Sequence, residues 1–300
     1  MKAVYTHYSK PYGQDIRNSQ THWLFPYLEF LILAYSSAKS KKFFDKTVLV
    51  TDVYGKKLII DDLGIPFDEV IIELDGCETN PRFWASGKIY GYTKAIKEYE
   101  PFVHFDNDAG YHIVPPKFDG ALKVQHIHSD YREGFGASLK TLVSRLVSET
   151  PNTFPYDIYH EAKEIKGCNC GMIMFNDKDV WNEFSKYTWA LQNADFFDKI
   201  EKEAVAPMYR HFNHWNVVIE EILLYLIYVR LKGKEPDVEF PTMNGFNFTK
   251  EIPNPNKYFH IWGSKKDREF MKVREKIAVD YLDKKLVDRI YNYFNRKQLK

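Results

Sequence analysis

The chain has 300 residues, 44% of them hydrophobic and 16% aromatic, which is enough apolar material for one large core or two fused lobes. Its 42 basic and 41 acidic side chains give a formal net charge of +1, which excludes the strong basic field of a typical nucleic-acid-binding protein. The three cysteines form no disulfide framework, the N-terminus has no apolar signal segment, and the longest apolar stretches are too short to span a bilayer. We therefore expect a soluble, cytoplasmic protein.

The first hundred residues alternate between short apolar runs and longer helical patterns. Strands are predicted at 2–8, 46–52, 68–74 and 102–105, and helices at 21–38, 55–64 and 83–100. Gly64 is expected to end the second helix as its C-cap. This alternation is typical of a parallel sheet built from right-handed crossovers. We therefore predict an α/β fold with a mostly parallel central sheet flanked by helices.

The second half of the chain is less regular and has no internal repeat or low-complexity linker. Strands are predicted at 120–130, at 170–177 and near the end of the loop 245–266, and helices at 135–149 and 214–233. From Asp267 the sequence indicates one long basic amphipathic helical region, and residues 263–300 carry 12 basic and 6 acidic side chains. Such a region packs on its own domain, joins a second subunit or lies on an anionic membrane.

Two aspartates, Asp106 and Asp108, follow the apolar run 102–105 with only Asn107 between them. Aspartate favours turns, so the pair either caps the following turn or ligates a cation that carries a phosphate. Two other predicted strands also end in polar residues, the first in Thr6, His7 and Tyr8 and the second in Asp52. In open parallel sheets, ligands bind at the edge where the carboxyl ends of the strands meet. This convergence favours the metal site.

Three motifs occur in one order along the chain: Asp106-x-Asp108, Asn169-x-Gly171 and His260-x-x-Gly263-x-x-Lys266. A chain with these motifs in this order resembles the GT-A-fold glycosyltransferases. It is most similar to the retaining group that includes glycogenin and the bacterial lipopolysaccharide galactosyltransferases.

The resemblance covers residues 1 to about 266 and has two departures. Asp267 and Arg268 replace the proline and tryptophan that often follow the lysine in that group, and its Asp-Gln-Asp has no clear counterpart near 216–221. The chain therefore resembles a distant branch.

The resemblance implies two parts: a GT-A-like nucleotide-sugar-binding and catalytic domain at 1–266, and a basic amphipathic C-terminal helical extension at 267–300. It also implies a metal-dependent glycosyltransferase that moves a sugar, expected to be a hexose, from a nucleoside-diphosphate sugar to an acceptor hydroxyl. A UDP-sugar donor, retention of configuration and a glycan, lipid-linked or protein acceptor are expected, with a role in surface-glycan synthesis.

By this resemblance, Asp106, Asp108 and His260 are the ligands of a Mn²⁺ or Mg²⁺ ion. Such an ion neutralises the charge that grows on the leaving diphosphate, and the imidazole favours Mn²⁺. Lys266 would place its ammonium on the diphosphate, where Gly263 permits close backbone approach. The catalytic residues are then expected to be the two aspartates and Lys266.

Further residues are candidates for contact with the substrates. The donor candidates are Thr6, Tyr8, Asp52, Lys88, Asn107 and Gly263, and the sugar and acceptor candidates are Asn169, Gly171 and Glu220. Lys88 is equally well an ordinary lysine on a helix surface, and the candidates at the strand ends are equally well turn or cap residues. Glu220 and Glu221 lie in an apolar helix where a buried carboxylate is costly, so either one faces the cleft or the pair faces water.

Three alternatives stay open from the sequence. A metal-dependent nucleotidyltransferase also places carboxylates at strand ends, and a non-catalytic module would bind nucleotide sugar without turnover. The spacings His126-x-His128 and Cys168-x-Cys170 are compatible with a zinc site.

The aromatic residues of the loop 150–167 either stack on a sugar ring or pack the loop: Phe154, Tyr156 and Tyr159.

Overall fold

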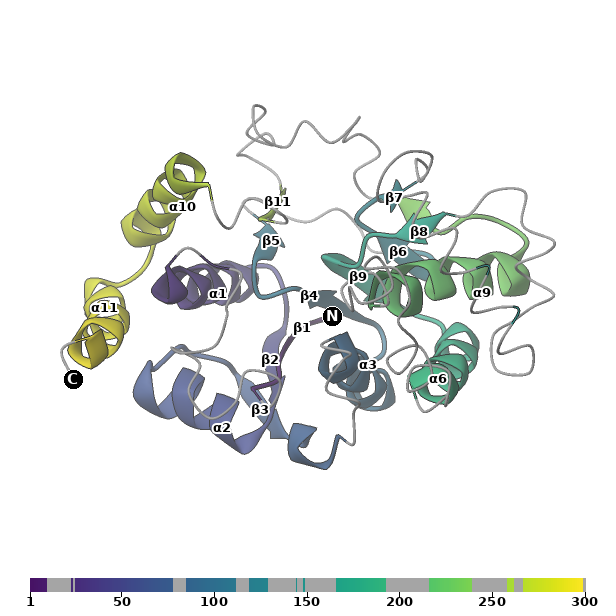
Figure 1. The fold of residues 1–300 in the computed structure, drawn as a ribbon, viewed down its shortest axis with the longest axis horizontal. Helices are drawn as coiled ribbons and strands as arrows, with labels where there is room; N and C mark the ends of the chain where they lie inside the picture. Colours follow the sequence, from purple (N-terminus) through teal and green to yellow (C-terminus); the bar gives the residue numbers. More distant parts are fainter. Residues whose placement is uncertain are drawn as a thin grey trace, which may run out of the picture.

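The centre of the molecule is a seven-stranded sheet with the strand order β10-β6-β9-β4-β1-β2-β3 (Figure 1). This computed structural model describes residues 1–9, 23, 25–77, 85–111, 119–128, 144, 148, 166–192, 216–238, 258–261 and 267–298. The strands are β1 (Lys2–His7), β2 (Lys46–Thr51), β3 (Glu69–Ile72), β4 (Phe102–Phe105), β6 (Leu122–Val124), β9 (Met172–Phe175) and β10 (Asp237–Val238). All neighbouring strands pair in parallel except β9, which runs antiparallel to both β4 and β6. The predicted α/β class with a mostly parallel sheet is therefore confirmed.

Two short antiparallel pairs extend from this sheet. The strand β5 (Ala109–Tyr111) follows the end of β4 and pairs with β11 (Tyr258–His260). The strand β7 (Ile127–His128) follows β6 and pairs with β8 (Gly167–Cys168). The first pair matters most for function, because it brings a segment from near the C-terminus to the end of β4.

One side of the sheet is covered by α1 (Pro26–Ser40), against which α10 (Arg268–Tyr281) and α11 (Lys284–Gln298) pack (Figure 1). Asp267 caps α10, because its Oδ1 accepts a hydrogen bond from the Phe270 backbone N–H at 3.0 Å. The buried apolar residues of the two C-terminal helices join the same cluster as those of α1: Met271, Ala278, Val287, Ile290 and Phe294. The apolar face of the C-terminal region is therefore buried within the chain itself.

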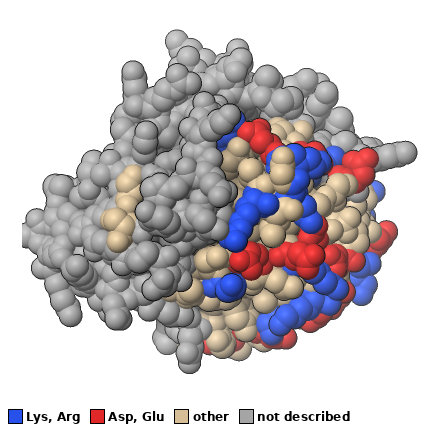
Figure 2. Space-filling model, turned by 90° about the vertical axis from the view of Figure 1, so that its right-hand side faces the viewer, with Lys and Arg blue, Asp and Glu red and all other residues tan. Residues whose placement is uncertain are grey.

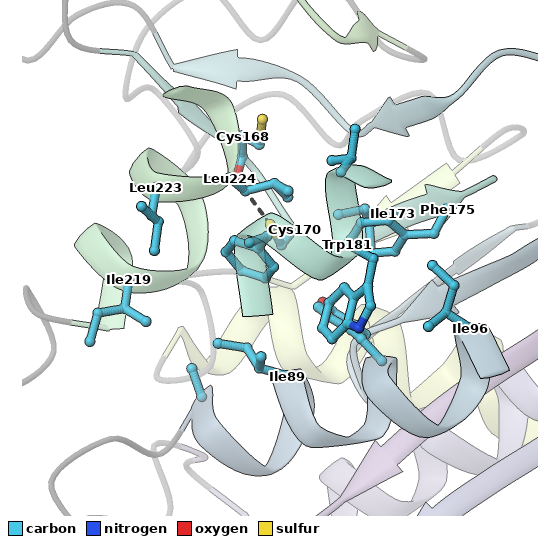
Figure 3. Packing of buried hydrophobic residues seen from close by; sticks show 14 of the residues in the cluster. Ile89, Ile96, Cys168, Cys170, Ile173, Phe175, Trp181, Ile219, Leu223 and Leu224 are labelled. Carbon is cyan, nitrogen blue, oxygen red and sulfur yellow. Dashed lines mark hydrogen bonds between the residues drawn. The ribbon is translucent and has the colours of Figure 1, made fainter. Parts of the chain in front are cut away.

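The other side is covered by α3 (Ala85–Tyr99), α6 (Lys178–Gln192), the π-helical segment η5 (Val218–Ile222) and α9 (Leu223–Lys232). Figure 3 shows this packing around Cys170, with Ile89 of α3, Trp181 of α6 and Leu223 of α9. The helix α6 is absent from the sequence-based prediction, although Asp177 caps it and its apolar residues recur at helical spacing: Val180, Trp181, Phe184 and Leu191.

The predicted helix at 55–64 is observed as α2 (Val53–Lys56) followed by the π-helical segment η2 (Lys57–Asp62), and Gly64 has the positive φ of 72° expected of a C-cap. A short 3-10 turn, η3 (Leu74–Gly76), follows β3. The predicted helix at 135–149 falls outside the described residues, apart from two helical positions at 144 and 148. In the described ranges, no helix has the length and apolar character needed to cross a bilayer. Cys77, Cys168 and Cys170 are buried, and no disulfide joins them.

The charges on the described surface are mixed. Figure 2 shows the right-hand side of the molecule, where lysine and arginine side chains are interspersed with aspartate and glutamate. On that face the described residues form no single basic stripe, which agrees with the balanced composition of the chain.

Candidate functional site

The turn after β4 is held from two sides. The Asp106 backbone N–H donates to Gly171 O at 2.9 Å, and the Ala109 N–H donates back to Asp106 O at 2.9 Å. Asp108 lies inside this turn and is only 4% exposed. The aspartates therefore do form a turn at the carboxyl end of β4, as the first interpretation of the motif expected, and the turn also gathers their carboxylates.

The strand β11 carries His260 to the same place. His260 is the register partner of Ala109, and the Ile261 N–H donates to Asp108 O at 3.1 Å. The His260 Nε2 atom lies 3.7 Å from Asp106 Oδ2 and 3.6 Å from Asp108 Oδ1, and the imidazole is 5% exposed. Two segments far apart in the sequence thus bring three metal-binding side chains together.

These three side chains fit a divalent cation. Among the described residues, the only group of three or more His, Cys, Asp or Glu side chains placed for a metal is Asp106, Asp108 and His260, with ligand atoms within 4.8 Å of one another. Two ligand atoms that each lie about 2.1 Å from one ion at a right angle are about 3 Å apart, so a small inward shift closes the site. Two carboxylates and one imidazole suit Mn²⁺ or Mg²⁺ and leave coordination positions for other oxygens.

Lys88 reaches this group from α3. The helix approaches β1 closely, because a Cβ on Gly87 would lie 2.6 Å from the Tyr8 side chain, and one on Gly91 would lie 2.3 Å from Thr6 Oγ1. The Lys88 Nζ atom lies 2.5 Å from Asp106 Oδ1 and 2.6 Å from Glu220 Oε1. It also donates to the backbone oxygen of Cys170 at 3.0 Å. An ammonium has three N–H donors, so these three acceptors account for all of them.

The charges around Lys88 shift the pKa of each partner. Burial alone would lower the pKa of Lys88, but Asp106 and Glu220 outweigh it and raise that pKa well above its ordinary value. Lys88 is therefore an ammonium. Burial raises the pKa of the Glu220 carboxyl, while Lys88 acts in the opposite direction. Glu220 is 4% exposed and lies on η5, and π-helical segments occur frequently at functional sites.

Buried polar atoms without a hydrogen-bond partner occur beside the turn. Within the described part of the chain they include His7 Nε2, His104 Nδ1 and Asn107 Oδ1. Two of these residues, His7 at the end of β1 and Asn107 after β4, contact each other, because Asn107 Nδ2 lies 3.3 Å from His7 Nδ1. Burial lowers the pKa of His7 to about 4 despite the attraction of Asp52, so its imidazole is neutral near pH 7. Native proteins rarely leave buried polar atoms without a hydrogen-bond partner. His7 and Asn107 are therefore candidates for contact with a ligand.

The other predicted donor residues at the strand ends have partners within the fold. Thr6 Oγ1 lies 3.1 Å from His104 Nε2, and Tyr8 Oη donates to Cys77 O at 3.3 Å. Asp52 caps α2, with Oδ1 accepting from the Gly55 N–H at 2.6 Å. Their contacts with a donor stay predictions.

The second motif lies next to the metal-binding group. Asn169 is buried, and its Oδ1 accepts from the Gly171 N–H at 3.0 Å. Gly171 is the residue whose backbone oxygen holds the Asp106 turn. Of the two glutamates, Glu220 faces Lys88, whereas Glu221 is partly exposed. Glu220 therefore lies beside the candidate centre through Lys88, and its contact with a sugar or an acceptor stays a prediction.

Several predicted residues fall outside the described part of the chain: Gly263, Lys266, Phe154, Tyr156 and Tyr159. The zinc alternative gains no support from the described residues, because His126, Cys168 and Cys170 are not part of any three-ligand group among them. Cys170 instead donates its thiol to Cys168 O at 3.2 Å, and burial raises the pKa of both thiols well above the ordinary value.

Sequence reasoning missed two residues beside the candidate centre. His7 appears in the first polar cluster but was assigned no role, and Gln125 was placed inside a longer predicted strand. Gln125 directly follows β6, is 3% exposed, and lies with its Oε1 2.9 Å from His260 Nδ1. The one available signal was that both are polar residues at the carboxyl end of an apolar run.

Comparisons with known proteins give remote structural similarities and one family. No curated protein sequence matches the chain. The chain is similar to the inositol-1-phosphate CTP transferase from T. maritima, with 12% identity over 94% of this chain and 97% of that chain, and a TM-score of 0.43. It is also similar to mouse xyloside xylosyltransferase 1 in its apo form, with 11% identity over 79% of this chain and 85% of that chain, and a TM-score of 0.38. A family of unknown function, DUF6734, matches residues 1–293, and the chain belongs to this family.

Proposed function

We propose that the chain is a metal-dependent glycosyltransferase that moves a hexose from a nucleoside-diphosphate sugar to an acceptor hydroxyl. The observation that carries the proposal is the group of Asp106, Asp108 and His260, whose ligand atoms meet within 4.8 Å just beyond β4. Ligands of open α/β sheets bind at this edge. The order of the three motifs, which resembles that of the GT-A-fold glycosyltransferases, supports the same assignment.

The three side chains would hold Mn²⁺ or Mg²⁺, and the imidazole of His260 favours Mn²⁺. When bound, the ion supplies a Lewis acid that neutralises the charge growing on the leaving diphosphate. Asp106 and Asp108 are fixed by the backbone of the turn, so they need little rearrangement to bind an ion. Gly263 and Lys266, outside the described residues, are proposed to contact the diphosphate on the strength of their motif alone.

Lys88 is proposed to act on the donor through its charge. Its three N–H donors have protein acceptors, and one of these is Asp106 Oδ1. It thereby holds Asp106 so that Oδ2 faces His260. Glu220 on the same side, with Asn169 and Gly171, would border the transferred sugar and the acceptor. We favour retention of configuration, in which the leaving phosphate assists the acceptor hydroxyl.

His7 and Asn107 are proposed to contact the nucleoside. The neutral His7 ring accepts from Asn107 at Nδ1, which leaves its proton on Nε2 as a donor. Asn107 Oδ1 offers an acceptor beside it. Uracil presents an N–H next to a carbonyl, which complements this pair and supports a UDP-sugar as the favoured donor.

The remaining partners are proposed from the resemblance. The acceptor would be a glycan, a lipid-linked glycan or a protein, in surface-glycan synthesis in the cytoplasm. Residues 1–266 would form the catalytic domain and 267–300 its helical extension. The apolar residues of α10 and α11 pack on α1, so contact with a membrane or a second copy would use the opposite, charged face.

A thermal-shift screen tests the proposal. The wild-type protein is measured with UDP-, GDP-, CMP- and dTDP-sugars and with nucleoside triphosphates, each with and without Mn²⁺. A ligand at about 100 times its Kd stabilises the folded state by about 2.7 kcal/mol, which raises Tm by several degrees in a chain of this size. We expect a Mn²⁺-dependent shift with one nucleotide sugar. Sugar transfer or slow hydrolysis of that donor then distinguishes an enzyme from a binding module.

Two variants complete the screen. Asp108→Ala should abolish the Mn²⁺-dependent shift, whereas Asp119→Asn should keep it, because Asp119 is an exposed surface residue outside the site. A shift with triphosphates alone would replace the proposal by a nucleotidyltransferase. If the folded wild-type protein responds to no nucleotide, the glycosyltransferase assignment is wrong.

A further inference from the structure

Gln125 contacts His260, one of the three proposed metal ligands, at the ring nitrogen that does not face the two carboxylates. Its Oε1 lies 2.9 Å from His260 Nδ1, and both side chains are almost completely buried. We propose that Gln125 is a positioning residue, which fixes the tautomer and orientation of His260 and thereby sets the metal affinity of the site. This inference rests on the proposed metal centre.

The hydrogen bond decides which nitrogen of His260 is available. An amide oxygen only accepts, so His260 Nδ1 must carry a proton, and a histidine that ligates through Nε2 carries no proton there. The lone pair of Nε2 then points to the side of Asp106 Oδ2 and Asp108 Oδ1, 3.7 Å and 3.6 Å away. In the other tautomer, Nε2 would donate its proton to one of these carboxylates and would not bind a metal. Gln125 therefore stabilises the tautomer that ligates.

Gly171 leaves room for this arrangement. A Cβ at Gly171 would lie 2.3 Å from the His260 ring atoms Cε1 and Nδ1 and 2.8 Å from Gln125 Oε1, which is closer than real side chains approach. The ring and the amide thus pack directly on the Gly171 backbone. The same glycine accepts the Asp106 N–H through its carbonyl. Gly171 consequently joins the His260 side of the site to the Asp106 side, in addition to any role beside the sugar.

Three elements build this support. Gln125 follows β6, Gly171 precedes β9, and the Gln125 N–H donates to Met172 O at 3.1 Å, extending the antiparallel pairing of the two strands. His260 arrives on β11. The amide is therefore placed by the rigid sheet, which is the condition for a side chain to orient a ligand accurately.

The test compares Mn²⁺ binding by variants at position 125, measured from the electron paramagnetic resonance signal of free Mn²⁺. Gln125→Met keeps the volume but removes the acceptor, and we expect its Kd to rise about 10- to 100-fold, as for other partners of metal-bound histidines. Gln125→Glu keeps an acceptor and should bind at least as tightly as the wild type. Gln192→Met is the matched control: Gln192 is buried on α6, accepts from Ser86 Oγ at 2.7 Å, and should leave the Kd unchanged.

Nitrogen-15 NMR of the metal-free protein reads the tautomer directly, with the His260 signal assigned by its loss in His260→Gln. The wild type should carry its proton on Nδ1, and Gln125→Met should shift the population toward Nε2–H. The inference is overturned if His260 Nδ1 carries no proton in the wild type, or if folded Gln125→Met keeps the wild-type Kd. A wild type that binds no Mn²⁺ refutes the metal centre instead, and the tautomer in that protein still decides the role of Gln125.

Discussion

The helices on the two sides of the central sheet are joined to the strands by different polar groups, hydroxyl groups on the α1 side and an ammonium between carboxylates on the α3 side. On the α1 side, Tyr5 Oη lies 2.8 Å from Ser36 Oγ and 2.7 Å from Ser40 Oγ, and all three side chains are buried. Ser36 Oγ also donates to Ala109 O at 2.6 Å. These hydroxyl groups tie α1 to β1 and to the start of β5 at little electrostatic cost.

On the α3 side, Lys88 lies between Asp106 and Glu220. Burying charges costs several kcal/mol per ion, and well-packed apolar residues often stabilise a fold equally well. On the α1 side, neutral hydroxyl groups join the helix to β1 and β5, although Glu29 and Arg274 are buried elsewhere on that side. We infer that the α3 side keeps its charges because they act at the substrate site, where a fixed positive group and a fixed carboxylate serve the chemistry.

Removal of the Lys88 charge should lower the free energy of unfolding more than any other change considered below. Lys88→Met leaves two carboxylates, Asp106 and Glu220, without their ammonium, and breaking a buried pair in this way costs about 3–5 kcal/mol. Urea unfolding measures the loss. The double variant Lys88→Met/Glu220→Gln should recover part of it, because one of the unpaired charges is then removed.

Lys97→Met is the control for this change, since Lys97 is exposed on the same helix and should alter the free energy of unfolding little. If Lys88→Met is as stable as the Lys97 variant, the charged cluster does not contribute as described.

The stability of the fold should also depend on pH through His7, which packs near Phe30 of α1. Its pKa is lowered by burial from 6.5 to about 4, so the unfolded chain binds more protons than the folded one between these two values. Stability therefore falls as the pH is lowered from 6.5 to 4, by about 3 kcal/mol from this group. Above pH 6.5 the contribution is constant.

Urea unfolding at pH 7 and pH 4 measures this loss in the wild type and in His7→Gln. The carboxylates and His104 titrate in both proteins. The difference between the stability that the wild type loses and the stability that His7→Gln loses therefore isolates the contribution of His7. Equal losses in both proteins would show that His7 is not held neutral by burial.

The smallest effect concerns the hydroxyl network. Tyr5→Phe removes one hydroxyl that contacts two serines, and we expect a destabilisation of about 1 kcal/mol. Because Tyr5 Oη contacts Ser36 and Ser40 and not a proposed metal ligand, calorimetric titration should give the wild-type Mn²⁺ affinity. A weakened Mn²⁺ affinity in Tyr5→Phe would mean that the hydroxyl network helps to position the metal-binding turn, which it reaches through Ser36 and the Ala109 backbone oxygen.

Much of the first half of the fold was predictable because its signals are local. The strand predicted at 46–52 and the helix predicted at 83–100 agree with β2 (Lys46–Thr51) and α3 (Ala85–Tyr99), since apolar runs and helical spacing define both within the segment itself. Asp106 and Asp108 were found in the same way, as polar residues directly after an apolar strand. His260 was found only through the resemblance of its motif.

The pairings that complete the site were not predictable. Lys88 and Glu220 each have alternatives in the sequence, and only the packing of α3 against η5 brings them together. Gln125 contacts His260 because β6 and β11 both end near the start of β9, which no local pattern determines. The helix α6 was missed although its cap and spacing were present in the sequence.

An anomalous difference map, recorded at a wavelength where manganese scatters from a crystal soaked in MnCl₂ and UDP, tests the proposed metal centre directly. We expect a manganese peak within bonding distance of Asp106, Asp108 and His260, with the diphosphate of UDP on its open side. A map in which UDP is bound but manganese is absent from these three side chains, or lies elsewhere, would contradict the proposed metal centre.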